Sequence, residues 1–163
     1  MKQKTSTEHI TPEQFQAITR SFIGLRISRA WRSDGSIVYF ELGQLSPEYS
    51  PRKDGSIRTR YYGEAAIYLE LGWRVERPRS IFFGSSSSRK RIDNCLEKLE
   101  GLEVVDISVR GRLPELVVQL SGGFWLQSFS SDEGQPEWDL RLREDAGYGK
   151  YLESKNGKIV LLK

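Results

Sequence analysis

The chain has 163 residues and a formal net charge of +3, with 37% hydrophobic, 11% aromatic and 29% charged residues. This composition excludes an intrinsically disordered chain, because disordered segments are poor in aromatic and β-branched residues. The length suits one domain with a core of its own. The small net charge argues against a dedicated nucleic-acid binder, although a sequence pI near 9.0 leaves that class open.

The cysteine content and the hydropathy pattern indicate a cytoplasmic protein. Cys95 is the single cysteine of the sequence, so no internal disulfide can form, as is typical of reducing compartments. The N-terminal stretch 1–14 is polar and lacks the apolar centre of a signal peptide. The longest apolar runs are far shorter than the roughly 20 residues that span a bilayer. We therefore expect no membrane segment.

The first half of the chain predicts a helix and several strands after a flexible tail at residues 1–10. Thr11 and Gln14 form the pattern of a capping box, and Gly24 ends the helix. The segment 44–60 contains two prolines and is expected to be a long loop. Alternating, β-branched and aromatic residues predict strands at 25–31, 37–42, 65–71, 73–77 and 81–83.

The second half predicts the same succession of elements. Four serines after Gly84 lead into a second helix at 88–99, which Gly101 ends. Further strands are predicted at 102–109, 115–120, 124–129, 138–142 and 158–162.

An internal repeat relates the two halves at an offset of 77 residues. Phe15, Phe22, Gly24, Leu25 and Ile27 fall on Ile92, Leu99, Gly101, Leu102 and Val104. We therefore predict a single domain over 11–163 with pseudo-repeats at about 11–83 and 84–142. The expected fold is α+β and β-rich. Two helix-plus-antiparallel-meander halves form one sheet or an open barrel, with the helices on one side and a pseudo-two-fold groove between the halves.

The sequence offers little for catalysis, and we expect a protein that is not an enzyme and has no cofactor or metal. His9 is the only histidine and falls in the predicted tail, which excludes internal triads and histidine-based metal motifs. Cys95 lies on the apolar face of the second helix, as a structural cysteine would. A carboxylate pair remains as an alternative, and its candidates are Asp132, Glu133, Glu137 and Asp139.

Charge is unevenly distributed along the sequence. The segment 74–91 has a net charge of +5, whereas 130–145 has a net charge of −4. Cations at the start of a helix are unfavourable, because the helix dipole is positive there. Three cations after a run of serines therefore suggest a site that binds an anion. The candidate residues are Ser86, Ser87, Ser88, Arg89, Lys90 and Arg91. The alternative interpretation is a helix cap with solvated charges.

The loop 49–62 mixes cations with tyrosines, the combination enriched at energetically important positions of protein interfaces. The candidate partner-binding residues are Tyr49, Arg52, Lys53, Arg58, Arg60, Tyr61 and Tyr62. The same mixture can stack on and neutralise single-stranded nucleic acid. We therefore keep a nucleic-acid or nucleotide binder using 49–62 and 84–91 as the alternative to a protein-binding module. A plain hairpin loop is the simplest interpretation.

In layout, the chain resembles the small bacterial immunity proteins of polymorphic toxin systems. The resemblance lies in the strand-turn-strand at 26–43, in Gly72-Trp73-Arg74-Val75-Glu76, and in the ending from Phe124-Trp125-Leu126 to Trp138-Asp139-Leu140. It implies a cytoplasmic inhibitor that folds on its own and blocks the active site of a cognate toxin, and it assigns no catalytic residue to this sequence. The two charged segments would then steer the encounter with the toxin.

Overall fold

The computed structural model describes residues 6–133, 138–144 and 147–163. Helix α1 (Pro12–Thr19) begins with the predicted capping box of Thr11 and Gln14, and helix α2 (Arg89–Leu96) begins after Ser88. Each helix continues as a short 3-10 turn, η1 (Arg20–Phe22) or η2 (Glu97–Leu99). Neither described helix is long and apolar enough to cross a membrane.

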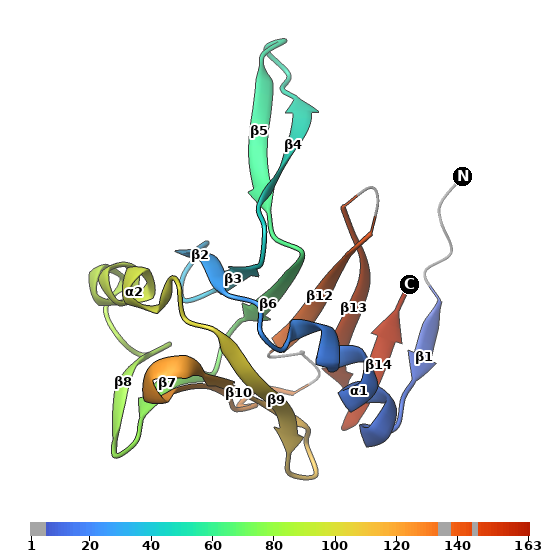
Figure 1. The fold of residues 1–163 in the computed structure, drawn as a ribbon, viewed down its shortest axis with the longest axis vertical. Helices are drawn as coiled ribbons and strands as arrows, with labels where there is room; N and C mark the ends of the chain where they lie inside the picture. The colour runs from blue at the N-terminus through green and yellow to red at the C-terminus, as the bar shows by residue number, and fades with distance from the viewer. Residues whose placement is uncertain (1–5, 134–137, 145–146) are drawn as a thin grey trace.

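Most of the chain forms two antiparallel sheets (Figure 1). The larger sheet has the order β1-β14-β13-β12-β6-β3-β2. Its strands are β1 (Thr7–His9), β2 (Ile27–Arg32), β3 (Val38–Leu42), β6 (Ala65–Leu69), β12 (Trp138–Glu144), β13 (Gly147–Lys155) and β14 (Lys158–Leu162). The smaller sheet has the order β8-β7-β11-β10-β9. Its strands are β7 (Trp73–Arg77), β8 (Ser80–Gly84), β9 (Val104–Arg110), β10 (Glu115–Leu120) and β11 (Phe124–Ser128), and η3 (Ser121–Gly123) joins the last two.

The remaining strands, β4 (Ser46–Pro51) and β5 (Ile57–Tyr62), pair with each other and form a separate two-stranded ribbon. Two helices with antiparallel sheets confirm the predicted α+β class. The described strands form no closed barrel. The sequence analysis allowed one sheet or an open barrel, whereas the strands of the structure are divided between two main sheets.

Each main sheet combines strands from both halves of the sequence. In the larger sheet, β12 and β13 extend the meander β2-β3-β6, with Trp138 paired to Leu69. In the smaller sheet, β7 and β8 extend the meander β9-β10-β11, with Trp73 paired to Ser128. The halves therefore exchange their closing hairpins, and this exchange is the reason that two mixed sheets form.

The helical elements recur at the offset seen in the sequence. Both boundaries of α2 and of η2 lie 77 residues after those of α1 and η1. Gly24 and Gly101 follow the two 3-10 turns, and each has a φ of +87°. This left-handed conformation is readily adopted by glycine alone, because a Cβ atom would clash with the backbone. The same residue type therefore ends the helical segment in both halves.

The two halves meet where the segments after these glycines pair with each other. Four backbone hydrogen bonds of 2.7–2.9 Å join them, from Gly24 N to Val104 O, Val104 N to Leu25 O, Ile27 N to Leu102 O and Gly101 N to Ile27 O. Arg26 and Glu103, which are equivalent at the offset of 77, face each other in the central β-bridge and form an ion pair at 3.8 Å. Because a residue there faces its own equivalent, we infer an approximate two-fold axis at this point.

The core lies between the two main sheets, and Trp73 and Trp138 are the largest of its fully buried side chains. The indole N–H of Trp73 donates to the carbonyl of Ser36, and that of Trp138 donates to the carbonyl of Pro114, each at 2.8 Å. Each acceptor lies in the turn between the first two strands of a meander. On the core side of the larger sheet, the ring of Phe15 in α1 packs edge-on against Trp138, with centroids 6.1 Å apart.

Two segments differ from the sequence-based expectation. Residues 7–9, assigned to the flexible tail, form β1 along the edge of β14. An unpaired edge offers hydrogen bonds to any extended segment, and local sequence does not reveal it. The segment 44–60, predicted to be a loop, contains most of the ribbon. Pro47 and Pro51 are tolerated in β4 because this strand has a neighbour on one side only.

Candidate binding surface

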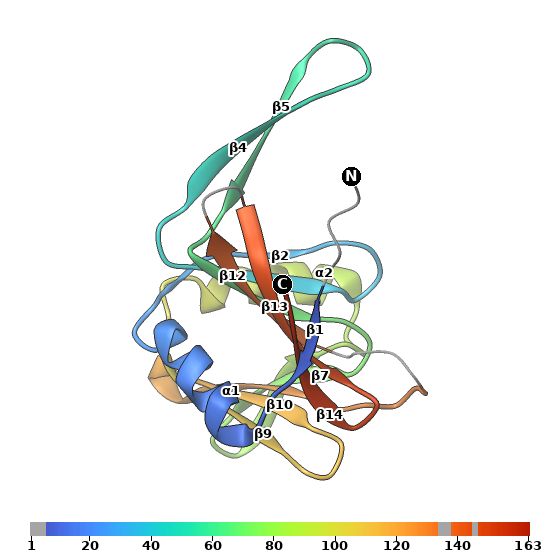
Figure 2. The ribbon, with the colours of Figure 1, turned by 90° about the vertical axis from the view of Figure 1, so that its right-hand side faces the viewer.

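The ribbon, residues 46–62, projects from the body of the molecule (Figure 2). Because neighbouring side chains of a strand alternate between faces, the observed register gathers apolar side chains on one of its faces. This face carries Pro47, Tyr49, Pro51, Ile57 and Tyr61 together with Thr59, and we call it the apolar face. Tyr49 is 66% exposed, Ile57 70% and Tyr61 50%, so the apolar face is open to solvent.

The opposite face of the ribbon is cationic and turns toward the larger sheet. Arg58 pairs with Ser50 and Arg60 with Glu48. Next to them, Tyr62 packs edge-on against Tyr148 of β13, with centroids 5.5 Å apart. The predicted residues therefore all lie on the ribbon but face different ways. Tyr49 and Tyr61 are on the apolar face, Arg58, Arg60 and Tyr62 are on the cationic face, and Arg52 and Lys53 are exposed at the tip.

Beneath the cationic face lies the outer face of the larger sheet, the side away from the core. Two rows of side chains cross this outer face in register. One row is Trp31, Tyr39, Tyr68, Asp139 and Glu153, and the other is Arg29, Glu41, Ala66, Arg141 and Tyr151. The rings of Trp31 and Tyr39 are stacked, with centroids 4.4 Å apart and 7° between their planes. The sheet thus presents aromatic and charged groups where a core-facing surface would present aliphatic ones.

Arg141 is the centre of the second row. Its guanidinium binds both carboxylate oxygens of Asp139, at 2.6 and 2.9 Å. It also lies 4.9–5.5 Å from the ring centroids of Tyr39, Tyr68 and Tyr151, and the small side chain of Ala66 leaves room for this. Burial raises the pKa of Asp139, although the bonds from Arg141 oppose the shift. The pair therefore holds the aromatic side chains in place.

Glu41 is a second carboxylate on the outer face, and it is only 2% exposed. It accepts hydrogen bonds from the Tyr148 hydroxyl and from the Gly63 amide at 3.0 Å. Burial, together with the bond to Glu41, raises the pKa of Tyr148 well above its ordinary value of 10.0. This contact fixes β13 against the segment that joins the ribbon to β6.

A cleft of about 490 Å³ separates the ribbon from the outer face. We call it the basic cleft. From the sheet it is lined by Arg29, Trp31, Tyr39, Glu41, Arg141 and Tyr148, and from the ribbon by residues 58–62. Four arginines against one buried carboxylate make the lining positive. The cleft therefore brings four of the predicted residues, Arg58, Arg60, Tyr61 and Tyr62, together with residues of the sheet.

Sequence reasoning missed the residues that the sheet contributes to the cleft. Their signal is the alternation in β3, where Val38, Phe40 and Leu42 are buried while Tyr39 lies between them on the other face. Alternation tells which side chains share a face. It does not tell that β12 and β13 continue the same sheet, which is what places Arg141 and Tyr148 beside Tyr39.

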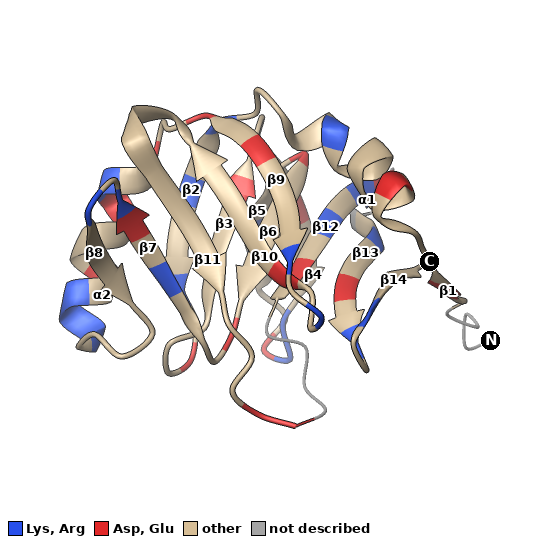
Figure 3. Ribbon diagram, turned by 90° about the horizontal axis from the view of Figure 1, so that it is seen from below, with Lys and Arg blue, Asp and Glu red and all other residues tan. Residues whose placement is uncertain are grey.

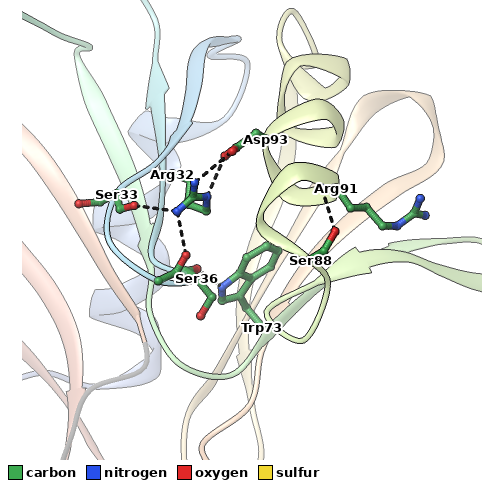
Figure 4. Close-up of polar contacts among 8 residues, drawn as sticks. Arg32, Ser33, Ser36, Trp73, Ser88, Arg91 and Asp93 are labelled. Carbon is green, nitrogen blue, oxygen red and sulfur yellow. Dashed lines mark hydrogen bonds and ion pairs between the residues drawn. The ribbon is translucent and has the colours of Figure 1, made fainter.

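The predicted anion site at the start of α2 has most of its hydroxyls engaged in the fold. Ser88 accepts from the Arg91 amide at 3.2 Å (Figure 4). Ser87 accepts from the Gly84 amide at 3.1 Å. The Arg91 guanidinium donates to the Phe82 carbonyl at 2.7 Å. Ser86, Arg89 and Lys90 are exposed. In this geometry Ser88 caps the helix and Ser87 closes the turn that precedes it.

The candidate carboxylates fall into different environments. Asp132 and Glu133 are exposed in the turn after β11, whereas Asp139 is buried and bound to Arg141. Glu137 lies outside the described residues. No cluster of three or more His, Cys, Asp or Glu side chains that could hold a metal ion occurs in the described parts of the chain.

Charge also segregates on the rest of the surface. Lys and Arg side chains lie along β7 and on the first turn of α2, and the turn after β11 is acidic (Figure 3).

Comparisons with protein-family models, with curated proteins and with solved structures give no match to this chain.

Proposed function

We propose that this chain is a non-enzymatic binding module and that a partner protein docks on the ribbon. The observation that carries the proposal is the exposed apolar face, with Tyr49, Ile57 and Tyr61, on an element that projects from the body (Figure 2). Clustered exposed apolar side chains mark interaction sites. Tyrosine is also enriched among the residues that contribute most to interface affinity.

The pairing of the ribbon supports the same proposal. Within the described part of the chain, β4 and β5 pair only with each other, so each strand keeps a free backbone edge. A two-stranded ribbon is marginally stable alone in water. A partner that covers the apolar face or adds a strand at an edge would stabilise it.

The finer proposal is an immunity protein of the bacterial cytoplasm that inhibits a cognate toxin by covering its active site. It is supported by the resemblance in layout, and by the basic segment 74–91 and the acidic segment 130–145, which would speed encounter with a charged partner. The free, buried thiol of Cys95 suits a reducing compartment.

Co-purification from the source cells tests ribbon docking. The tagged protein is isolated at moderate salt after nuclease treatment, and bound proteins are identified by mass spectrometry. We expect one stoichiometric protein partner, and we expect its loss in the double variant Tyr49→Ser, Ile57→Ser. Both side chains are exposed, so an unchanged Tm controls for folding.

The alternatives give different results in the same experiment. A partner that the double variant retains fully would contradict docking on the apolar face. Material that disappears with nuclease would replace the proposal by the nucleic-acid binder that uses 49–62 and 84–91. If the partner is a toxin, cells that make it should survive only when this chain is made too.

A further inference from the structure

The basic cleft has more positive charge than its own surroundings neutralise. Arg141 is paired with Asp139, and Glu41 is occupied by Tyr148 and Gly63. Arg29, Arg58 and Arg60 also line the cleft. Each is exposed, and none forms an ion pair with a carboxylate of the described residues. The cleft therefore has three guanidinium groups available to an anionic ligand.

The two aromatic side chains that β2 and β3 contribute to the cleft have occupied ring faces. Trp31 is stacked on Tyr39, and the guanidinium of Arg29 lies 5.7 Å from the Trp31 centroid. Arg141 lies 5.2 Å from the centroid of Tyr39. Single-stranded nucleic acid is recognised chiefly by stacking of bases on open aromatic faces. These occupied rings therefore favour a ligand that is recognised through hydrogen bonds.

Trp31 also has an unsatisfied donor. Its indole nitrogen is buried and has no hydrogen-bond partner, although Trp31 lines the cleft. A buried donor left without an acceptor costs about 1–3 kcal/mol. A ligand rich in acceptor oxygens that entered the cleft would remove this cost if the side chain adjusted toward it.

We propose that the basic cleft binds an acidic segment of the partner protein, a run of Asp or Glu side chains whose carboxylates accept from Arg29, Arg58 and Arg60. Arginine suits this role because its planar guanidinium binds a carboxylate through two parallel hydrogen bonds. The inference rests on the proposed docking of a protein on the ribbon. Tyr49 and Ile57 do not line the cleft, whereas Tyr61 does, so the apolar face and the basic cleft adjoin on this one element and a single partner can contact both.

A fluorescein-labelled decaglutamate peptide is the probe for this site, measured by fluorescence anisotropy at low ionic strength. We expect binding that weakens with added salt and at least about tenfold weaker binding by the double variant Arg58→Glu, Arg60→Glu. Arg29→Gln, a change on the body, should also weaken binding and keeps the test valid if the reversal disturbs the ribbon.

The matched control is the double variant Lys155→Glu, Lys158→Glu, which changes the net charge equally. These exposed lysines face each other at the β13–β14 turn, away from the ribbon (Figure 2). Wild-type affinity is expected in this control. Equal weakening in both double variants, or no binding of the peptide, would overturn the inference. Tighter binding of decathymidylate than of decaglutamate would overturn it in favour of nucleic acid.

The peptide also separates this inference from the proposed function. The variant Tyr49→Ser, Ile57→Ser should bind decaglutamate as the wild type does, because neither side chain lines the cleft. If that variant loses the co-purified partner while Arg58→Glu, Arg60→Glu keeps it, the cleft is not the site of an acidic segment and ribbon docking stands. If both variants keep the partner, docking on the ribbon itself is wrong.

Discussion

Glu41 and Tyr148 form the contact on which the outer face depends. A carboxylate that is 2% exposed accepts a tyrosine hydroxyl and a backbone amide, so its loss of hydration is compensated by charge-assisted hydrogen bonds. Tyr148 in turn packs against Tyr62 at the root of the ribbon. Tyr148 therefore links this buried carboxylate to the root of the ribbon.

Tyr148 should make the protein less stable at alkaline pH. Its pKa is raised by burial and by the bond to Glu41, so above pH 10.0 the unfolded chain loses a proton that the folded chain keeps. The contribution of Tyr148 is complete below that pH and falls as pH rises, by at most about 1.4 kcal/mol per pH unit. We expect urea midpoints to fall less steeply in Tyr148→Phe than in the wild type.

Tyr61→Phe is the control for this prediction, because Tyr61 is exposed on the ribbon. Its midpoints should follow the wild-type pH dependence. The same slope in all three proteins would show that Tyr148 does not stay protonated in the folded chain.

At the scale of elements, the ribbon is an addition to a fold that does not need it. None of its residues 46–62 is buried, and the buried core lies entirely in other elements. The strands on either side of it, β3 and β6, already pair directly, with Leu42 opposite Ala65. The ribbon therefore extends from a complete sheet.

Excising the ribbon should remove binding and leave the fold. Replacing 47–61 by Asn-Gly keeps the Ser46–Tyr62 pair and closes it with a type I′ turn. Since no buried residue is lost, we expect the free energy of unfolding to change by less than about 1 kcal/mol, with loss of both the protein partner and decaglutamate. Urea denaturation and co-purification measure the two effects. A large loss of stability would mean that the ribbon supports the sheet.

The elements also show how far local sequence determines this fold. The capping residues Thr11 and Ser88 and the stop residues Gly24 and Gly101 act through contacts within a few positions, so both helical segments were predictable. The ribbon was missed because its prolines and charges resemble those of a loop, whereas its strands are defined by pairing. The basic cleft could not be predicted, since it depends on β12 lying beside β6, a contact between segments far apart in the sequence.

For the whole molecule, the exchange of hairpins makes each half incomplete. The larger sheet needs β12 and β13, and the smaller sheet needs β7 and β8. Trp73 pairs with Ser128 of the second half, and Trp138 pairs with Leu69 and packs against Phe15 of the first half. The approximate two-fold relation at Arg26 and Glu103 thus describes two halves that are completed by each other.

Two fragments, separated by a cut after Gly84, test this dependence. Residues 1–84 and 85–163, made separately, should each lack the cooperative thermal transition of the intact chain. When the two fragments are mixed in equal amounts, they should associate and regain the far-UV and tryptophan spectra of the intact chain. The cut breaks one peptide bond, and every pair of strands can still form. A fragment that folds alone would show that its hairpin is dispensable.

The pairing of β1 with β14 has a consequence for how the protein is made. The first described strand completes the sheet only against the last, through Thr7 opposite Leu162 and His9 opposite Val160. These partners lie far apart in the sequence, so β1 stays unpaired during synthesis until the segment 158–162 has left the ribosome. For the same reason β6 keeps an open edge, which is prone to aggregation, until β12 emerges and pairs with it.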